Sequence, residues 1–438
     1  MGHLNRTATA VASGSESDTL AWLSAARTCL DTCLTGFREL GTSPGPEFQA
    51  VLANASRDVT NAIEATARRR RDTTKHNTTR TRTDVDTSQG CLRRPDGDGV
   101  ALRQGRRPVH TPADADLVVA KDGTGNFCTV EEALEAAARR SDGGRVVVYV
   151  KAGVYDEHVE VWTSNLVLLG DGTGRTVITG NRSVQGGYTT FSSATFAVNA
   201  DGFVACGVTF RNTAGAGAQQ AVAMRATADR VAFYRCGFEG HQDTLYAHVL
   251  RHFYRECAVA GTVDFVFGDA AAVLQRCSLR VRRPLLPGQP AVVTAQGRAD
   301  RHERTGFAVH GGRVSASAKF ASGGAPFGTF LGRPWKEFSR VVYMEAYMDG
   351  TVDAAGWLPW GGTECGQDTA FYGEYRNTGP GSGTSGRVPR DHRPRRGVGV
   401  HRRCVGGRRL VAGFHRHSLH FRTLTEYSKR GLNKPIDN

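Results

Sequence analysis

The sequence predicts a right-handed parallel β-helix, a solenoid in which each coil contributes several short parallel strands. Gly occurs 53 times and Met 4 times, which favours a turn-rich β architecture over a helical bundle. Short β-branched runs recur about every 20 to 25 residues, as in a solenoid. They lie at 145–150, 159–169, 176–179, 203–210, 230–234, 252–259, 272–281 and 340–344. A β-sandwich is the alternative, disfavoured because the two-residue turns of antiparallel hairpins are scarce.

Helical periodicity is concentrated before this β-rich region. Between residues 18 and 40, apolar residues such as Leu20, Leu23 and Leu30 recur at intervals of three or four residues, the spacing of one helix face. A Gly- and Pro-rich turn at 41–46 separates a second expected helix at 48–67. Within the β-rich region we expect one helix, at 130–138.

Composition divides the chain into four segments. Residues 1–67 form the helical segment, and residues 113–388 form the β-helix. Between them, 68–112 is rich in Arg, Thr, Asp and Gly and has almost no apolar periodicity, so it cannot bury enough surface to offset the entropy of ordering. We therefore expect a disordered basic linker there. The basic tail at 389–438 shows no strand or helix period and is also expected to be disordered.

The formal net charge of +14 is concentrated near the C-terminal end. Residues 387–438 contain 14 Lys or Arg and 3 Asp or Glu, a net charge of +11 that leaves +3 for residues 1–386. A nearly neutral body does not favour nucleic-acid binding. No window of about 18 residues is continuously apolar, and the first 25 residues lack an apolar signal core. The sequence predicts no membrane span and contains no visible secretory peptide.

Two carboxylates lie in apolar, β-prone segments, where an unpaired charge is costly. Asp264 is in the middle of the run 261–268, and Asp243 precedes it by 21 residues. A cation such as Arg333 lowers a carboxylate pKa, so we expect Asp264 to be ionised and able to attack a carbonyl carbon. We expect Asp243, next to an ionised acid, to keep its proton and act as a general acid.

Amide and aromatic side chains complete this predicted site. Gln220 and Gln242 can donate hydrogen bonds to an oxyanion without adding charge. Tyr246, Phe267 and Trp335 offer flat faces for sugar rings. Together with the two acids and an arginine, these residues indicate carbohydrate ester or glycoside chemistry.

Residues 113–388 resemble the plant pectin methylesterase, or pectinesterase, family. The resemblance is carried, in the family's order and spacing, by 119–127 (VAKDGTGNF), 212–223 (NTAGAGAQQAVA), 240–246 (GHQDTLY), 261–268 (GTVDFVFG) and 331–335 (LGRPW). It implies a parallel β-helix fold, in agreement with the prediction above. The N-terminal helices resemble part of the inhibitor-like pro-domain that precedes the catalytic domain in many of these proteins.

The resemblance also implies a role for each site residue. Asp264 would be the nucleophile, and Asp243 the proton donor and then the base. Gln220 and Gln242 would stabilise the transition state, and Arg333 would be a further catalytic residue. The substrate-binding positions would be Thr190, Gln220, Tyr246, Phe267, Arg333 and Trp335.

The implied reaction is hydrolysis of the methyl ester on the C6 carboxyl of galacturonate in pectin, releasing methanol during cell wall modification. It requires no metal and no organic cofactor. The implied partners are pectin and a pectinesterase inhibitor protein, and we expect a monomer located outside the cell, in the cell wall.

The cysteines and sequons bear on secretion. Cys236 and Cys257 flank the first acid motif and either form a disulfide or remain buried thiols; the sequence leaves both open. Four Asn-x-Ser/Thr sequons would make a secreted form a glycoprotein, beginning at Asn5, Asn54, Asn77 and Asn181.

Other functions remain as alternatives. A polygalacturonase or pectate lyase would need a cluster of acids or calcium-binding carboxylates, and neither pattern is present in the sequence. A catalytically defective pectin-binding or inhibitor-like protein is a second alternative, because the basic tail replaces the closing segment of the family. A polyanion binder acting through that tail is a third.

Overall fold

The computed structural model describes residues 16–78, 112–140, 143–286, 288–317, 327–361, 365–366 and 368–383. Most of the expected linker, from 79 to 111, and the expected basic tail at 389–438 lie outside these residues.

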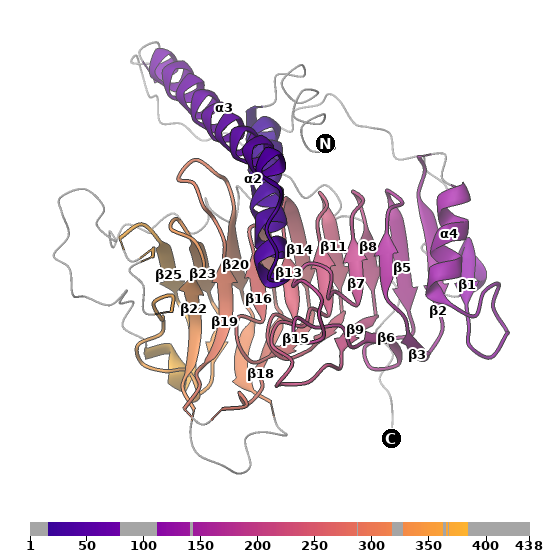
Figure 1. Ribbon diagram of the computed structural model, residues 1–438. Helices are drawn as coiled ribbons and strands as arrows, with labels where there is room; N and C mark the ends of the chain where they lie inside the picture. Colours follow the sequence, from indigo (N-terminus) through magenta and orange to yellow (C-terminus); the bar gives the residue numbers. More distant parts are fainter. Residues whose placement is uncertain are drawn as a thin grey trace, which may run out of the picture.

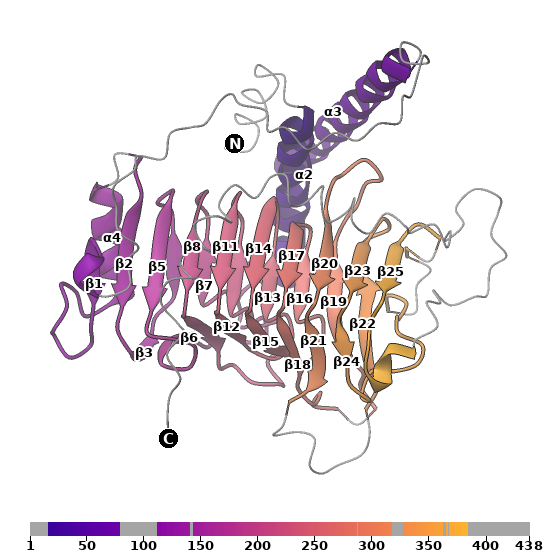
Figure 2. The ribbon, with the colours of Figure 1, turned by 180° about the vertical axis from the view of Figure 1, so that it is seen from behind.

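Most of the described chain winds into coils built from three parallel sheets that run side by side (Figures 1 and 2). Every pairing between named strands is parallel. Neighbours within a sheet come from successive coils, so each strand pairs with the one that follows it by a full turn of the solenoid. The predicted parallel β-helix is therefore confirmed, and the β-sandwich alternative is wrong.

The strands divide among the three sheets as follows. The ten-stranded sheet contains, in spatial order, β1 (Leu117–Val119), β2 (Val146–Val150), β5 (Leu166–Gly170), β8 (Val204–Cys206), β11 (Val231–Tyr234), β14 (Arg251–Arg255), β17 (Ala271–Gln275), β20 (Gly306–His310), β23 (Arg340–Met344) and β25 (Phe371–Tyr375). The eight-stranded sheet contains β24 (Tyr347–Met348), β21 (Arg313–Ala316), β18 (Ser278–Val281), β15 (Ala258–Gly261), β12 (Gly237–Glu239), β9 (Thr209–Asn212), β6 (Thr176–Gly180) and β3 (Gly153–Asp156). The seven-stranded sheet contains β22 (Thr329–Pro334), β19 (Ala291–Gln296), β16 (Val266–Gly268), β13 (Leu245–Ala247), β10 (Met224–Ala226), β7 (Phe196–Val198) and β4 (Val159–Val161).

Several long runs in the sequence are each two strands joined by a bend. The expected strand at 203–210 is β8 followed by β9, and the backbone turns between them at Gly207, whose φ is +70°. A positive φ is easy for glycine and ends the extended run. The short strands of the seven-stranded sheet, including β10, β13 and β16, were not predicted individually. Three residues are too few to show a periodic pattern.

The interior of the solenoid is filled by aromatic side chains from successive coils. The Phe233 and Tyr254 rings stack with centroids 5.2 Å apart, and the Phe210 and Phe238 rings stack at 5.8 Å. All four side chains are fully buried. Stacked aromatic layers of this kind add to the hydrophobic stabilisation of the coils that carry the site.

Helix α4 (Val130–Arg140) covers the N-terminal end of the β-helix (Figure 1). Its buried face includes Ala133, Leu134 and Ala137. The Glu157 carboxylate accepts hydrogen bonds from the first backbone N–H groups of the helix, at 2.9–3.0 Å, which satisfies donors that an isolated helix leaves unpaired. The expected helix at 130–138 is thus present and two residues longer. Short 3-10 turns lie at Pro112–Asp114 and Pro380–Gly383.

Two long helices precede the solenoid: α2 (Glu16–Glu39) lies against it, and α3 (Pro46–Thr78) extends away from it (Figure 1). They pack on each other through a small apolar cluster that includes Leu23 and Ile63. The second helix was expected to end at residue 67. It continues to Thr78, so residues 68–78 of the expected linker are helical, in line with the high helix propensity of its arginines. Within the described ranges, no helix is long and apolar enough to cross a membrane.

Cys236 and Cys257 lie on neighbouring coils as free, buried thiols. The Cys236 N–H donates to the Cys257 sulfur at 3.4 Å, but each thiol is directed at a backbone carbonyl oxygen. Of the two alternatives that the sequence left open, the structure contains the buried thiols and not the disulfide.

Candidate active site

The candidate site is a groove on the outer face of the seven-stranded sheet. Alternate residues of a strand point to opposite faces, so Leu245 and Val266 enter the core while Tyr246 and Phe267 face the groove. Strand pairing places Tyr246 beside Phe267, and the same row continues through Ala295 of β19 to Arg333 of β22. A cavity of about 450 Å³ opens over this row.

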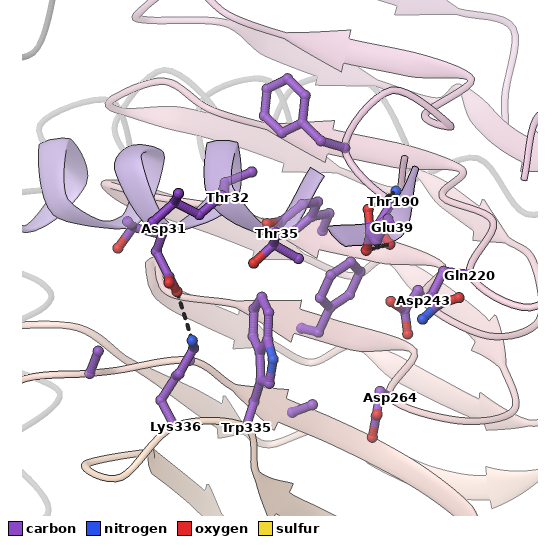
Figure 3. A pocket seen from close by; sticks show the side chains of 18 of the residues that line it. Asp31, Thr32, Thr35, Glu39, Thr190, Gln220, Asp243, Asp264, Trp335 and Lys336 are labelled. Atoms are coloured by element: carbon purple, nitrogen blue, oxygen red, sulfur yellow. Dashed lines mark hydrogen bonds and ion pairs between the residues drawn. The ribbon is translucent and has the colours of Figure 1, made fainter. Parts of the chain in front are cut away.

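Asp243 and Asp264 occupy equivalent positions on neighbouring coils, each two residues before a strand of this sheet. Equivalent positions on adjacent parallel strands are about 4.8 Å apart, so the two acids are adjacent along the groove. Both have left-handed backbones, with φ of +62° and +51°. This conformation is uncommon for a non-glycine residue and is typical of functional sites. It turns each carboxylate into the cavity, where Figure 3 shows both.

Two glycines fix the loop that carries Asp264. A Cβ at Gly261 would lie 2.2 Å from the Phe265 Cβ. At Gly268, where φ is +122°, a Cβ would lie 2.0 Å from the Ala247 carbonyl oxygen. No other residue type fits these positions, so the sequence pattern Gly-Thr-Val-Asp-Phe-Val-Phe-Gly has a direct steric cause.

Arg333 holds Asp264 through both of its carboxylate oxygens. Its Nε donates to Oδ1 at 2.9 Å and to Oδ2 at 3.2 Å, and its Nη2 donates to Oδ2 at 2.6 Å. The guanidinium carbon also lies 4.4 Å from the centre of the Trp360 ring. A two-point contact of this kind fixes the carboxylate plane as well as its position.

The environments of the two acids shift their pKa values to different extents. Burial raises the pKa of Asp243 well above its ordinary value, and the adjacent Asp264 charge raises it further. Burial also raises the pKa of Asp264, but the hydrogen bonds and charge of Arg333 oppose this rise. Arg333 lowers the Asp264 pKa as expected, but burial outweighs this effect, so the net shift is upward. The expected order remains, with Asp264 giving up its proton before Asp243.

Both predicted amides line the same cavity. Gln220 and Gln242 come from adjacent coils, and the Ala221 N–H donates to the Gln242 carbonyl oxygen at 3.2 Å. The buried Oε1 atom of Gln220 has no hydrogen-bond partner. Figure 3 shows Gln220 beside Asp243. Amides in this position can donate to an oxygen that becomes negative near the acids.

Aromatic rings form the apolar part of the groove. Tyr246 and Phe267 stack with centroids 4.1 Å apart, and Trp335 meets Phe267 edge to face at 6.0 Å. Two further rings, Phe191 and Trp360, line the groove and were not predicted. Nothing in their local sequence separates them from core aromatics, because only packing across coils brings them to the cavity.

Helix α2 lies over this groove, as the close view in Figure 3 shows. The Glu39 carboxylate accepts hydrogen bonds from Thr190, at 2.8 Å from the backbone N–H and at 2.6 Å from Oγ1. Asp31 pairs with Lys336 at 2.7 Å. The predicted substrate contact Thr190 is therefore occupied by a carboxylate from the same chain.

Further contacts fasten α2 along its length. Thr28 donates to the buried Asp269 carboxylate at 2.7 Å, and Arg27 donates to Asp300 at 3.0 Å. Nearer the start of the helix, Trp22 packs on an apolar patch of the solenoid. All of these partners lie more than 200 positions apart in the sequence, and no local pattern predicts them.

Among the residues that the structure describes, no group of three or more His, Cys, Asp or Glu side chains is arranged to hold a metal ion. The fold and groove together define a parallel β-helix protein with a buried pair of unequal aspartates, an arginine clamp and a row of aromatic rings.

Comparison with known proteins places this arrangement in one family. A sequence model described as Pectinesterase matches residues 116–393. The chain is 46% identical to Probable pectinesterase/pectinesterase inhibitor 17 of Arabidopsis thaliana over 379 residues, which cover 85% of this chain and 69% of that protein. It is 44% identical to Pectinesterase 2 of Citrus sinensis, covering 88% and 71% of the two chains.

Solved structures agree. The pectin methylesterase from carrot superimposes with a TM-score of 0.60 at 48% identity, covering 63% of this chain and 86% of that one. That from Aspergillus niger superimposes with a TM-score of 0.55 at 30% identity, covering 62% and 87%. The chain belongs to the pectinesterase family, whose members are carboxylic ester hydrolases.

Proposed function

We propose that this protein hydrolyses the methyl esters of galacturonate in pectin, releasing methanol and leaving free carboxylates on the polymer. The observation that carries the proposal is the pair of buried aspartates, of which Asp264 is clamped by Arg333 and Asp243 has the higher pKa. The aromatic row that lines the same groove suits a chain of sugar rings. The pectin methylesterases that the chain resembles support this substrate.

In the first half of the proposed reaction, an oxygen of ionised Asp264 attacks the ester carbonyl carbon. The carbonyl oxygen becomes an oxyanion and accepts hydrogen bonds from the Gln220 and Gln242 amides. As the tetrahedral intermediate collapses, the bond to the methoxy group breaks. Asp243 gives its proton to the leaving oxygen, and methanol departs.

The second half returns the enzyme to its starting state. Asp243, now ionised, takes a proton from a water molecule, whose oxygen attacks the carbonyl carbon of the anhydride between substrate and Asp264. The anhydride bond breaks, Asp264 is released as a carboxylate, and Asp243 is again protonated. Arg333 keeps Asp264 in place throughout, while Tyr246, Phe267 and Trp335 hold the sugar chain, with Thr190 as a further contact.

Helix α2 gives the proposal a second part: the N-terminal helices act as an inhibitor element of the same chain. With Glu39 on Thr190 and Asp31 on Lys336, a polymer cannot lie in the groove until α2 moves. The two-part name of the Arabidopsis relative, pectinesterase/pectinesterase inhibitor, supports this division. A separate inhibitor protein would meet the same rim of the groove.

The proposed location follows from the substrate, since pectin is a polymer of the cell wall outside the cell. Of the sequons, those at Asn54 and Asn181 begin at exposed positions, where a secreted form can carry glycans. We propose that the protein acts there as a monomer.

The test of the proposed function is methanol release from highly methyl-esterified pectin by the full-length chain. Asp264→Asn keeps the shape of the side chain but removes the nucleophile, and we expect it to lower the rate by at least about a thousandfold. Glu64→Gln on α3, far from the groove, is the matched control for removing one carboxylate. A folded, pectin-binding chain that releases no methanol, even when Glu39→Gln weakens the docking of α2, would instead support the defective pectin-binding alternative.

A further inference from the structure

A buried cation that the proposed reaction does not use lies at one end of the outward row of residues that passes under the groove. Arg225 is the middle residue of β10, whose neighbours Met224 and Ala226 enter the core. Its register partner is Tyr246, so Arg225 belongs to the same outward row as Tyr246, Phe267 and Arg333. Four strand steps of about 4.8 Å each separate it from Arg333 along the groove.

The charge of Arg225 is buried and poorly compensated. Its side chain is 2% exposed. Nη1 donates to the neutral oxygens of Asn199, at 2.9 Å, and Thr227, at 2.7 Å, and the Nε atom has no partner. Within the described part of the chain, the carboxylate that lies within 4 Å is Glu160, at 3.9 Å on a side chain that is 55% exposed. Burial lowers the pKa of Arg225 to about 10, which still leaves it charged at neutral pH.

A buried cation with mostly neutral partners is costly, and an apolar or amide residue would be cheaper at this position. Helix α2 does not supply the missing negative charge. Of the α2 acids whose side chains the structure describes, Asp18 pairs with Arg251, Asp31 pairs with Lys336 and Glu39 binds Thr190. The α2 residue near Arg225 is Cys29, whose thiol stays neutral because burial raises its pKa to about 12. The groove therefore keeps a positive charge available even when α2 covers it.

The ring of Phe191 lies between the Arg225 charge and the groove in which the substrate would bind. Its centre lies 3.5 Å from the guanidinium carbon, and it also lines the groove. A sugar stacked on the other face of the ring would place its C6 substituent about 7 Å from the guanidinium, since each stacking contact adds about 3.5 Å. At that distance, in a partly desolvated groove, attraction between a carboxylate and a cation changes binding by roughly tenfold or more.

We propose that Arg225 is a specificity-determining residue that favours a free galacturonate carboxylate in the part of the groove over Phe191 and Tyr246. The enzyme would then act preferentially on pectin that is already partly de-esterified, next to existing free carboxylates. This proposal rests on the proposed esterase function. Arg225 acts by attraction through Phe191 and does not touch the reacting ester.

The experiment compares two substrates, a fully methyl-esterified galacturonan oligomer and one with about half of its esters removed. The kcat/KM for the half-de-esterified oligomer is divided by that for the esterified oligomer, and this preference ratio is measured for the full-length parent, Arg225→Gln and Arg225→Lys. Each is also made in a Glu39→Gln background, in which α2 is held less tightly. We expect Arg225→Gln to lower kcat/KM for the half-de-esterified oligomer about tenfold, through KM, and to change that for the esterified oligomer less than about twofold. Arg225→Lys, which keeps the charge, should retain most of the preference.

A second variant keeps the test decisive if Arg225→Gln fails to fold. Glu160→Gln changes an exposed side chain and removes the carboxylate that lies 3.9 Å from Arg225, so it should strengthen the preference for the half-de-esterified oligomer. Equal losses on both oligomers in Arg225→Gln, or no change in the ratio in Glu160→Gln, would overturn the proposal.

Binding to fully de-esterified polygalacturonate separates this inference from the proposed function, because it requires no turnover. If the parent binds this polymer but releases no methanol from esterified pectin, the esterase proposal fails. Arg225→Gln must still weaken binding, and Glu160→Gln must still strengthen it, for the Arg225 inference to stand.

Discussion

Replacing Glu39 by Gln should release α2 from the groove and raise the activity of the full-length chain. The Glu39 carboxylate accepts two hydrogen bonds from Thr190, at 2.8 Å and 2.6 Å. A hydrogen bond to a charged group contributes about 1.5–3 kcal/mol. The amide keeps one acceptor but loses the charge, so we expect docking of α2 to weaken by about 1.5–2 kcal/mol, or roughly 10- to 30-fold. The nearby pair of Asp31 and Lys336 is partly exposed and adds less than about 1 kcal/mol.

Two measurements follow this change. Methanol release from esterified pectin should rise by up to the same factor, because a groove that is open for only a fraction of the time lowers the apparent affinity by that fraction. Alkylation of Cys29, which is buried near Arg225 while α2 is docked, should accelerate relative to the exposed Cys33 four residues later. Glu64→Gln, which removes a carboxylate paired with Arg68 on α3, serves as the control.

The reasoning would be refuted by a folded Glu39→Gln protein whose methanol release and Cys29 labelling both match the control. Faster labelling without faster methanol release would show that α2 moves but does not limit access of the polymer.

Three further predictions concern the groove and its support. Both acids have raised pKa values in the folded state, so their protonated forms are favoured by folding and stability declines as pH rises through those values. Asp243→Asn should accordingly raise the melting temperature at pH 7–8, by the equivalent of about 1–3 kcal/mol, have little effect near pH 4, and abolish methanol release. The rate of the parent should fall on the acid side as Asp264 is protonated, at a higher pH than an exposed aspartate would give, which a pH profile of kcat/KM will measure. Gly268→Ala should cost about 3 kcal/mol or more in chemical denaturation, because the new Cβ would meet the Ala247 carbonyl at 2.0 Å; an unchanged midpoint would contradict the steric argument.

The sequence was sufficient to predict the fold class and the two acids, the arginine and the amides of the candidate site. Repeating β-branched runs predicted the parallel solenoid, because each coil of such a fold must supply its own short apolar strands. An acid inside an apolar segment, as at Asp264, must have a partner or a function, and this reasoning led to both aspartates and to Arg333. The 21-residue separation of the acids is one coil, which is why positions far apart in the sequence share one groove.

Tertiary structure decided what depends on burial and on distant contacts. The Asp264 pKa is raised and not lowered, because the coils around it exclude water more effectively than Arg333 stabilises the charge. The groove aromatics Phe191 and Trp360, and the position of α2 with Glu39 on Thr190, result from contacts between residues separated by many coils or by 151 positions. A local sequence pattern shows only the periodicity of its own segment. The burial and electrostatic environment of a site depend on every residue that the fold places near it, including residues far away in the sequence. The amino-acid sequence by itself therefore determined the solenoid and predicted the order in which the two acids lose their protons. The tertiary structure determined the direction of the Asp264 pKa shift and the covering of the groove.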